Sequence, residues 1–112
     1  MAQEPLIIED LIFDDDHRPF RRWYRKQSSE AKAEIDVRLE MVKKRSYGSH
    51  RQLPRGVIEL KVDFGQGLRL YGGEWRGKFF LLIHGGFKKT QQEDIRLATA
   101  LWVTFTKNAD QR

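Results

Sequence analysis

Cysteine is absent from the 112-residue chain, and this absence excludes several classes of protein. Without a thiol there is no disulfide scaffold, no thiol catalysis, no zinc ribbon and no iron–sulfur cluster. Long apolar runs are absent too, since none approaches the roughly 20 residues that a membrane-spanning helix needs. The opening residues, MAQEPLIIED, lack the basic start and apolar stretch of a secretory signal. We therefore expect a soluble, cytoplasmic protein with no membrane contact, folded as one domain over residues 1–112 with flexible ends at 1–5 and 108–112.

Charge is distributed unevenly along the chain. Residues 1–16 carry six acids and no base, whereas residues 17–55 carry twelve bases and four acids. Residues 56–112 carry nine bases and six acids, and the net charge of the whole chain is +5. A basic excess of this kind favours a polyanionic partner through counterion release. A solvated surface has the same composition, so the two alternatives are a nucleic acid or acidic protein partner and a merely solubilising charge.

The first half of the chain predicts a short strand and two helices. Apolar residues within 6–13 indicate one strand, or two fragments with a break. Pro19 suits the first turn of a short helix, where its missing N–H costs nothing. Ser28 and Ser29 are good caps for a second helix that runs to about Arg45.

The second half predicts a loop, a meander and a final helix. Residues 46–56 have no periodicity and predict the loop. Period-two alternation predicts three antiparallel strands, at residues 57–62, 68–71 and 78–84. We expect turns at 64–67 and 72–77, and the pair Gly85–Gly86 as the end of the meander. Thr90 opens a capping box for a helix that runs to about Lys107. The order β-α-α-β-β-β-α predicts an α+β domain, with a helical hairpin and a C-terminal helix on one face of a mainly antiparallel sheet.

Three consecutive aspartates, at residues 14–16, are the sharpest hint of a metal site. Adjacent residues rarely ligate one ion together, and acids just before a helix start are favoured by the helix dipole. We therefore assign no metal and no cofactor. His17 and His50 are interpreted as surface histidines, since one lies in a charged segment and the other in a loop.

The uncovered face of such a sheet is where we expect chemistry. Alternation along the strands lets one set of polar side chains gather there: Glu59, Lys61, Arg69, Tyr71 and His84, with Lys88 and Lys89 just beyond. Cleavage of RNA by its own 2′-hydroxyl needs a base, an acid and cations placed where phosphate charge develops. The basic members of this set can supply the charge, and the others can move protons. An ordinary solvated sheet face shows the same alternation, so both interpretations stand at this point.

Several stretches resemble a known family. The front half carries Pro19, Phe20 and Trp23, then Ala31, Ile35, Arg38 and Leu39, then GVIELK at residues 56–61. The back half carries GQGLRLY at 65–71 and LLIHGGFKKTQQEDI at 81–95. Together they resemble the RelE/ParE superfamily of type II toxin–antitoxin toxins, in the HigB-like, phage-derived "addiction module killer protein" branch. The resemblance covers about residues 19–105.

This resemblance implies a RelE-like fold and a metal-independent, ribosome-dependent endoribonuclease that cuts mRNA and inhibits translation. It implies a helix-turn-helix, HigA-like antitoxin as partner, beside the ribosome and mRNA, and a toxin–antitoxin hetero-oligomer on operator DNA. The ParE branch has a similar fold but targets DNA gyrase. A gyrase-inhibiting toxin and an inactive nucleic-acid-binding module are therefore the alternative functions.

The resemblance also carries particular residues. Arg69 matches the arginine after the Gly-x-Gly turn, Lys88 matches the lysine after Gly-Gly-x, and Lys61 stands where the pattern usually has arginine. Phe87 and Lys89 depart from the family's usual small acidic residue and serine or threonine. With the sheet-face set, the predicted catalytic residues are Lys61, Arg69, Tyr71, His84 and Lys88. The predicted RNA- or ribosome-binding residues are Arg18, Arg21, Arg22, Arg25, Lys43, Lys44, Arg45, Arg51, Arg55 and Lys89.

Overall fold

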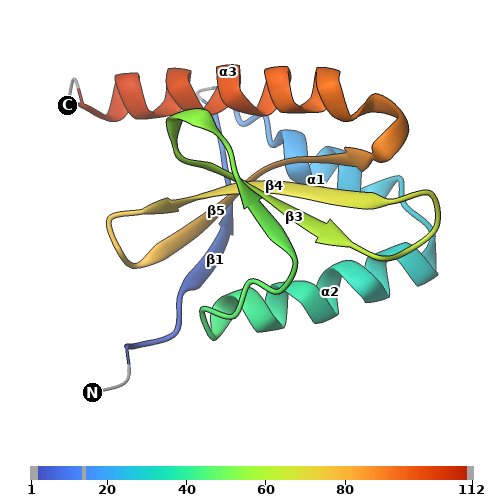
Figure 1. Cartoon of the computed structure of the whole chain (residues 1–112). Coiled ribbons are helices and arrows are strands. Elements are labelled where there is room, and N and C mark those ends of the chain that lie inside the picture. The colour runs from blue at the N-terminus through green and yellow to red at the C-terminus, as the bar shows by residue number, and fades with distance from the viewer. Residues whose placement is uncertain (1–2, 14, 111–112) are drawn as a thin grey trace.

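The computed structural model describes residues 3–13 and 15–110. Within them the chain forms an α+β fold with a five-stranded mixed sheet and three α-helices (Figure 1). The strands are β1 (Ile7–Asp10), β2 (His50–Gln52), β3 (Val57–Val62), β4 (Leu68–Trp75) and β5 (Phe79–Phe87). The helices are α1 (Pro19–Arg25), α2 (Ser29–Lys43) and α3 (Gln91–Asp110), with short 3-10 turns η1 (Pro54–Gly56) and η2 (Lys88–Thr90). Asp14, part of the acidic run, and the chain ends at 1–2 and 111–112 lie outside this description.

The sheet has the strand order β1-β5-β4-β3-β2. β1 runs parallel to β5, and every other neighbouring pair is antiparallel. After β1 the chain passes through α1 and α2 to β2 at the opposite edge and returns through β3 and β4 to β5. This long connection allows β5 to run parallel to β1. The predicted strand near the N-terminus, both N-terminal helices and the meander are confirmed.

The helix starts follow from local chemistry. Pro19 occupies the first turn of α1, and the Ser28 side chain caps α2 by accepting the Ala31 N–H at 3.1 Å. α3 begins at Gln91 and continues to Asp110, beyond the predicted end at Lys107. Residues 108–110, which were expected in a flexible end, are therefore helical.

Glycines account for most differences between the predicted and observed strands. Gly72 and Gly73 lie inside β4, and Gly85 and Gly86 lie inside β5, where turns or a strand end were predicted. Each is a place where another group approaches the backbone. A Cβ at Gly72 would lie 2.2 Å from the Phe80 ring. β2 was missed because its three residues are exposed and pair with β3 through backbone hydrogen bonds, which leave no pattern in the sequence.

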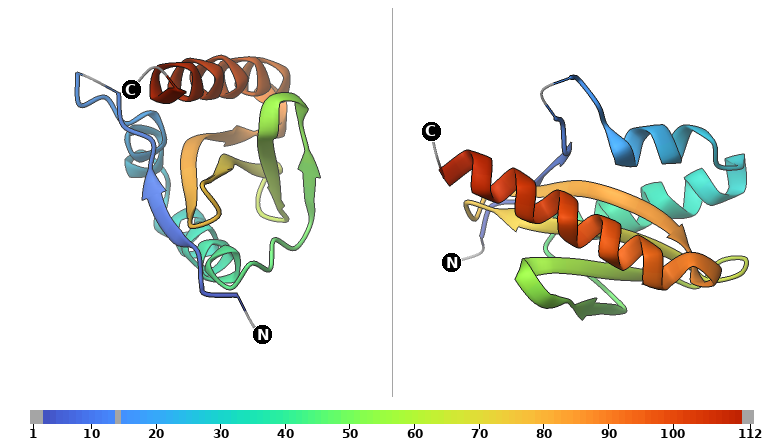
Figure 2. Two further views of the ribbon diagram at one scale, coloured as in Figure 1. Left: turned by 90° about the vertical axis from the view of Figure 1, so that its left-hand side faces the viewer. Right: turned by 90° about the horizontal axis from the view of Figure 1, so that it is seen from above.

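Both faces of the sheet are covered, which corrects the prediction of helices on one face only (Figure 2). α1 and α2 pack on one face, where Phe20 of α1 and Ile35 of α2 join an apolar cluster that includes Leu60 of β3. α3 packs on the other face, where Ala98 and Trp102 meet a second apolar cluster. That cluster includes Val57, Tyr71, Leu81 and Ile83. These side chains make the second face apolar, so it needs a cover of its own.

A β-bulge in β5 determines where His84 points. Tyr71 pairs with His84 and Gly72 pairs with Leu82, so Ile83 is an extra residue on β5. Strict alternation would put His84 on the same side of the sheet as Leu82, but a bulge interrupts this alternation. Instead His84 stacks on Tyr71, with ring centroids 6.4 Å apart, on the side that α3 covers.

The contact between β5 and α1 can be tested at Gly85. A Cβ there would lie 2.3 Å from the Trp23 ring, so Gly85→Ala should lower the free energy of unfolding by about 1–3 kcal/mol through overpacking. In a Trp23→Leu background the added methyl group has room, and the cost should be smaller. Urea unfolding of the four proteins measures this coupling. An equal cost in both backgrounds would contradict the contact.

Candidate functional site

Three of the five predicted catalytic residues lie around one cleft. Lys61 and Arg69 are directly opposite each other in the β3–β4 register, so both side chains are on the same face. The Lys88 N–H donates to the Gly67 carbonyl oxygen at 2.8 Å, which brings η2 against the turn before β4. All three side chains line a cleft of about 410 Å³. The cleft lies beyond the N-terminal end of α3, where the helix does not cover the sheet.

Four further polar side chains line this cleft and were not among the predicted site residues: Arg38, Ser49, Asp63 and Gln66. Arg38 comes from α2, and its guanidinium donates to the carbonyl oxygens of Tyr47 and Ser49 at 3.4 and 3.3 Å. Nothing in the helical periodicity of α2 distinguishes Arg38 from the other basic residues of that helix. Only the path of the loop after α2 brings it to the cleft.

The cleft is strongly positive. Four cationic side chains line it, and Asp63 is the one carboxylate among the lining residues. None of the four forms an ion pair with a residue that the structure describes. Burial lowers the pKa of Arg38, and Arg69 Nε is buried without a hydrogen-bond partner. An anion with several oxygen acceptors would satisfy these groups.

Tyr71 and Glu59 are placed differently from the expectation of an open sheet face. Both side chains are fully buried beneath α3. Glu59 accepts hydrogen bonds from Tyr71 OH at 3.1 Å, from Gln91 Nε2 at 2.9 Å and from the Arg51 guanidinium at 3.1 Å. Burial raises the pKa of Tyr71, and the charge and hydrogen bond of Glu59 raise it further. A phenol held in this way is a structural group rather than one that reaches a substrate.

His84 belongs to a second network at the start of α3. Its Nε2 donates to Asp94 Oδ1 at 3.0 Å, and the Thr90 hydroxyl donates to Asp94 Oδ2 at 2.7 Å. The Asp94 carboxylate lies over Gly86, where a Cβ would approach it to 2.0 Å. Asp94 therefore connects β5, η2 and α3. Because Lys88 begins η2, this network holds Lys88 at the cleft while His84 itself does not line it.

The predicted RNA-binding residues divide into several groups. Arg18, Arg22 and Arg25 line a broad hollow of about 700 Å³ on α1, together with Lys26. Arg21 lines it too, but forms two hydrogen bonds with Asp10, at 2.9 and 3.1 Å. We call this hollow, lined by Arg18, Arg21, Arg22, Arg25 and Lys26, the α1 surface. It is separate from the cleft, because the two share no lining residue.

The other predicted RNA-binding residues do not form one surface with α1. Arg45 donates to the carbonyl oxygens of Glu4 and Gly77, and Arg51 pairs with Glu59, so both are structural. Lys43 pairs with Glu40 at 2.9 Å, and Lys44 follows it at the end of α2. Arg55 lines a separate hollow with Trp102, and Lys89 lies in η2 beside the cleft residue Lys88.

Two further observations concern metals and membranes. Among the residues that the structure describes, no three His, Asp or Glu side chains are grouped closely enough to hold a metal ion. No helix in the described part of the chain combines the length and apolar character needed to cross a membrane.

Comparison with known proteins finds a relative in Haemophilus influenzae, strain ATCC 51907 / DSM 11121 / KW20 / Rd, whose description is "Uncharacterized protein". The two chains are 35% identical over 83 residues, which is 73% of this chain and 84% of the relative. The chain therefore belongs to the same family as this Haemophilus influenzae protein. No family model matches the chain, and no solved structure matches it.

The tyrosines provide a test of the buried networks. Burial raises the pKa of Tyr24, Tyr47 and Tyr71 above the usual 10.0, and hydrogen bonds to Asp36, Glu74 and Glu59 raise it further. The folded protein therefore keeps its phenolic protons at a pH where the unfolded chain loses them. The free energy of unfolding should be fully retained below about pH 10 and fall as the pH rises above it.

The fall in the free energy of unfolding at high pH is measured by following tyrosinate absorbance and circular dichroism together during alkaline titration. We expect the Tyr71 tyrosinate, measured as the difference in absorbance between the wild-type protein and Tyr71→Phe, to appear only as the helical signal is lost. In a Tyr71→Phe variant the free energy of unfolding should decrease less steeply with pH. Ionisation of Tyr71 near pH 10 in a protein that is still folded would contradict its buried hydrogen bond to Glu59.

Proposed function

We propose that this protein is the toxin of a type II toxin–antitoxin module, with a RelE-like fold, and that it cleaves mRNA on the ribosome. One observation carries the proposal: Lys61, Arg69 and Lys88, which the family resemblance selects, converge on one positive cleft. They come from β3, β4 and η2, and Arg38 joins them from α2. The element order β-α-α-β-β-β-α supports the RelE-like assignment, with β2 as a short addition at the sheet edge.

The chemistry that suits this cleft is transfer of a phosphodiester to the neighbouring 2′-hydroxyl. The 2′-oxygen bonds to phosphorus, the bond from phosphorus to the 5′-oxygen breaks, and the products are a 2′,3′-cyclic phosphate and a 5′-hydroxyl. Negative charge grows on the phosphate oxygens in the transition state, and fixed cations stabilise it there. Arg69 can bind two phosphate oxygens in fork geometry, whereas Lys61 and Lys88 act as point charges.

We assign proton transfer to a residue that lines the cleft, and not to Tyr71 or His84, which belong to the buried networks. Asp63 is the one carboxylate among the described residues that line the cleft, and we assign it the role of taking the 2′-hydroxyl proton. Water in the open cleft supplies the proton that the leaving 5′-oxygen takes up. Tyr71 and His84 act indirectly, because they hold the elements that carry the cations. This proposal keeps Lys61, Arg69 and Lys88 as the catalytic residues and replaces the two expected proton carriers.

The α1 surface supports a large RNA partner. Arg18, Arg22, Arg25 and Lys26 line one hollow, and Asp16 is the one acid among the described residues that line it. A surface of this kind binds phosphates without reading sequence. We propose that it contacts ribosomal RNA in the cytoplasm while mRNA occupies the cleft. A HigA-like antitoxin and assembly with it on operator DNA complete the proposed module.

The proposal is tested by translation in vitro, with the ends of the mRNA mapped by primer extension. Cuts at codon boundaries that appear only when ribosomes are present would support it. Intact mRNA with loss of DNA supercoiling would instead indicate a gyrase inhibitor. Neither effect, from a folded protein, would indicate a nucleic-acid-binding module without activity.

Replacing Arg69 separates catalysis from folding. Arg69→Ala should lower the rate of ribosome-dependent cleavage by about 10²–10³, the usual cost of removing one preorganised contact. The melting temperature should change little, because the Arg69 side chain makes only a weak hydrogen bond to the Leu68 carbonyl oxygen, at 3.3 Å. Arg69→Lys should recover part of the rate. Arg96→Ala removes an exposed arginine of α3 outside the cleft and should leave the rate unchanged. A full rate in Arg69→Ala would remove Arg69 from the mechanism.

Salt dependence tests the α1 surface. If about five phosphates are neutralised, log affinity for ribosomes should fall against log salt with a slope of about −3.5 to −4.5. Replacing both Arg22 and Arg25 with glutamine should make that slope shallower by about 1.4–1.8. Ribosome sedimentation over a salt series measures both slopes. An unchanged slope in the double variant would show that these arginines do not contact phosphate.

A further inference from the structure

α3 leaves part of the sheet uncovered. The helix packs on β3, β4 and β5, while β1 lies beyond it at the edge of the sheet. The residues of Glu9–Ile12 line a hollow of about 290 Å³ with Trp75, Phe79, Leu81 and Phe105. A second hollow of about 470 Å³ shares Ile12, Trp75 and Phe105 with the first. The two hollows therefore form one continuous groove, which we call the β1–α3 groove.

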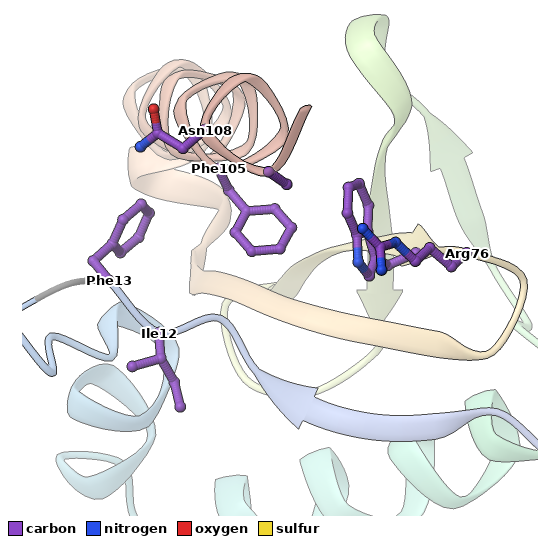
Figure 3. Close-up of a pocket in the computed structure, with 7 residues that line it drawn as sticks. Ile12, Phe13, Arg76, Phe105 and Asn108 are labelled. Atoms are coloured by element: carbon purple, nitrogen blue, oxygen red, sulfur yellow. The ribbon is translucent and has the colours of Figure 1, made fainter. Parts of the chain in front are cut away.

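The groove is lined by apolar side chains from three parts of the chain, with a few polar ones among them (Figure 3). Ile12 and Phe13 follow β1 on one side, and Phe105 with Asn108 faces them from the last turns of α3. Trp75, at the end of β4, contacts Phe105 edge-on with ring centroids 5.0 Å apart. The rings of Phe13, Trp75 and Phe105 are all partly exposed here.

Exposed aliphatic side chains extend this apolar area. Ile7 is 49% exposed and Ile12 is 44% exposed, and both are on or next to β1. Leu97 is 45% exposed and lies on the same side of α3 as Leu101 and Phe105, because they are four residues apart in the helix. Contiguous exposed apolar area of this kind marks an interaction surface.

The charged residues beside the groove indicate which kind of partner it binds. Glu9 lines it and has no ion-pair partner among the described residues, while Asp10 is already paired with Arg21. Asp15 is exposed on the turn after β1, whereas Asp16 lines the α1 hollow and lies 3.9 Å from the Arg18 guanidinium. Asn108 and Ala109 of the last turn of α3 line the groove, so the negative end of the helix dipole is close to it. Arg76, the one cation among the described residues that line the groove, lies over the Trp75 ring at 5.1 Å. These charges repel phosphate and attract lysine or arginine.

We propose that the β1–α3 groove binds a basic amphipathic segment of a partner protein, whose apolar side chains enter between Phe13 and Phe105 and whose cations face Glu9. RNA is disfavoured by the acidic wall. A second copy is disfavoured as well, because a two-fold contact places the same patch on both sides and brings the acidic walls together. That the partner is the antitoxin rests on the proposed function. That the groove binds a basic amphipathic segment rests on the residues of the groove alone.

The experiment uses defined probes on the full chain. Two synthetic helical peptides have the same leucine pattern, one with lysine and one with glutamate at its polar positions, and a single-stranded RNA oligonucleotide is the third probe. Amide and tryptophan indole chemical shifts report the binding position. We expect the lysine peptide alone to shift the signals of Glu9, Ile12 and Trp75. Glu9→Lys and Ile12→Lys should each weaken this binding about tenfold. Val37→Lys, at an exposed site on α2, should leave it unchanged.

Other outcomes overturn the proposal. The proposal fails if the lysine peptide does not bind, or if Val37→Lys weakens its binding as much as Ile12→Lys does. It also fails if RNA shifts the groove signals, or if the protein forms a dimer that Ile12→Lys abolishes. Glu9 and Ile12 are both exposed, so the variants keep the core intact, and circular dichroism verifies this. A protein that binds the peptide but cleaves no mRNA overturns the proposed function and leaves the groove proposal standing. An active nuclease that does not bind the lysine peptide overturns the groove proposal and leaves the proposed function standing.

Discussion

The carboxylate of Glu59, fully buried between the sheet and α3, is the group on which much of the arrangement depends. It accepts hydrogen bonds from β2 through Arg51, from β4 through Tyr71 and from α3 through Gln91. A buried carboxylate is stable only when such donors surround it, and loss of a partner from a buried ion pair typically costs about 3–5 kcal/mol. Glu59 therefore specifies how the first turn of α3 lies on the sheet. With the Asp94 network beside it, it also specifies where the positive cleft begins.

The placement of α3 divides the surface into regions of different chemistry. Where the helix starts, Lys61, Arg69 and Lys88 remain uncovered and face no ion-pair partner within the described chain. Near its other end, the helix leaves an apolar groove whose second wall is acidic. One helix thus separates a cleft suited to a polyanion from a groove suited to a basic protein segment. The two proposed binding regions share no lining residue.

Much of the fold could be predicted from the sequence, because its signals are local. Pro19 and Ser28 act within one turn of their own helices, and period-two alternation reports strands that have a buried side. The convergence of Lys61 and Arg69 was also accessible, since a tight turn at Gly65–Gly67 places the two residues opposite each other. Charge counts likewise identified the basic region from which the α1 surface is built.

Which residues are covered was decided only by the tertiary structure. Glu59 and Tyr71 alternate like outward-facing residues, yet α3 buries them, and the sequence does not specify which face a distant helix covers. His84 lies on the predicted face beside Tyr71, but it does so only because one extra residue, Ile83, interrupts the alternation along β5. Gly72 and Gly85 have the local signature of turns but serve close approaches by Phe80 and Trp23. The sequence by itself determined the elements and the chemical character of their side chains, because propensity and periodicity act over a few residues. The assignment of those side chains to cleft, core or groove depended on contacts between residues far apart in the chain, which only packing determines.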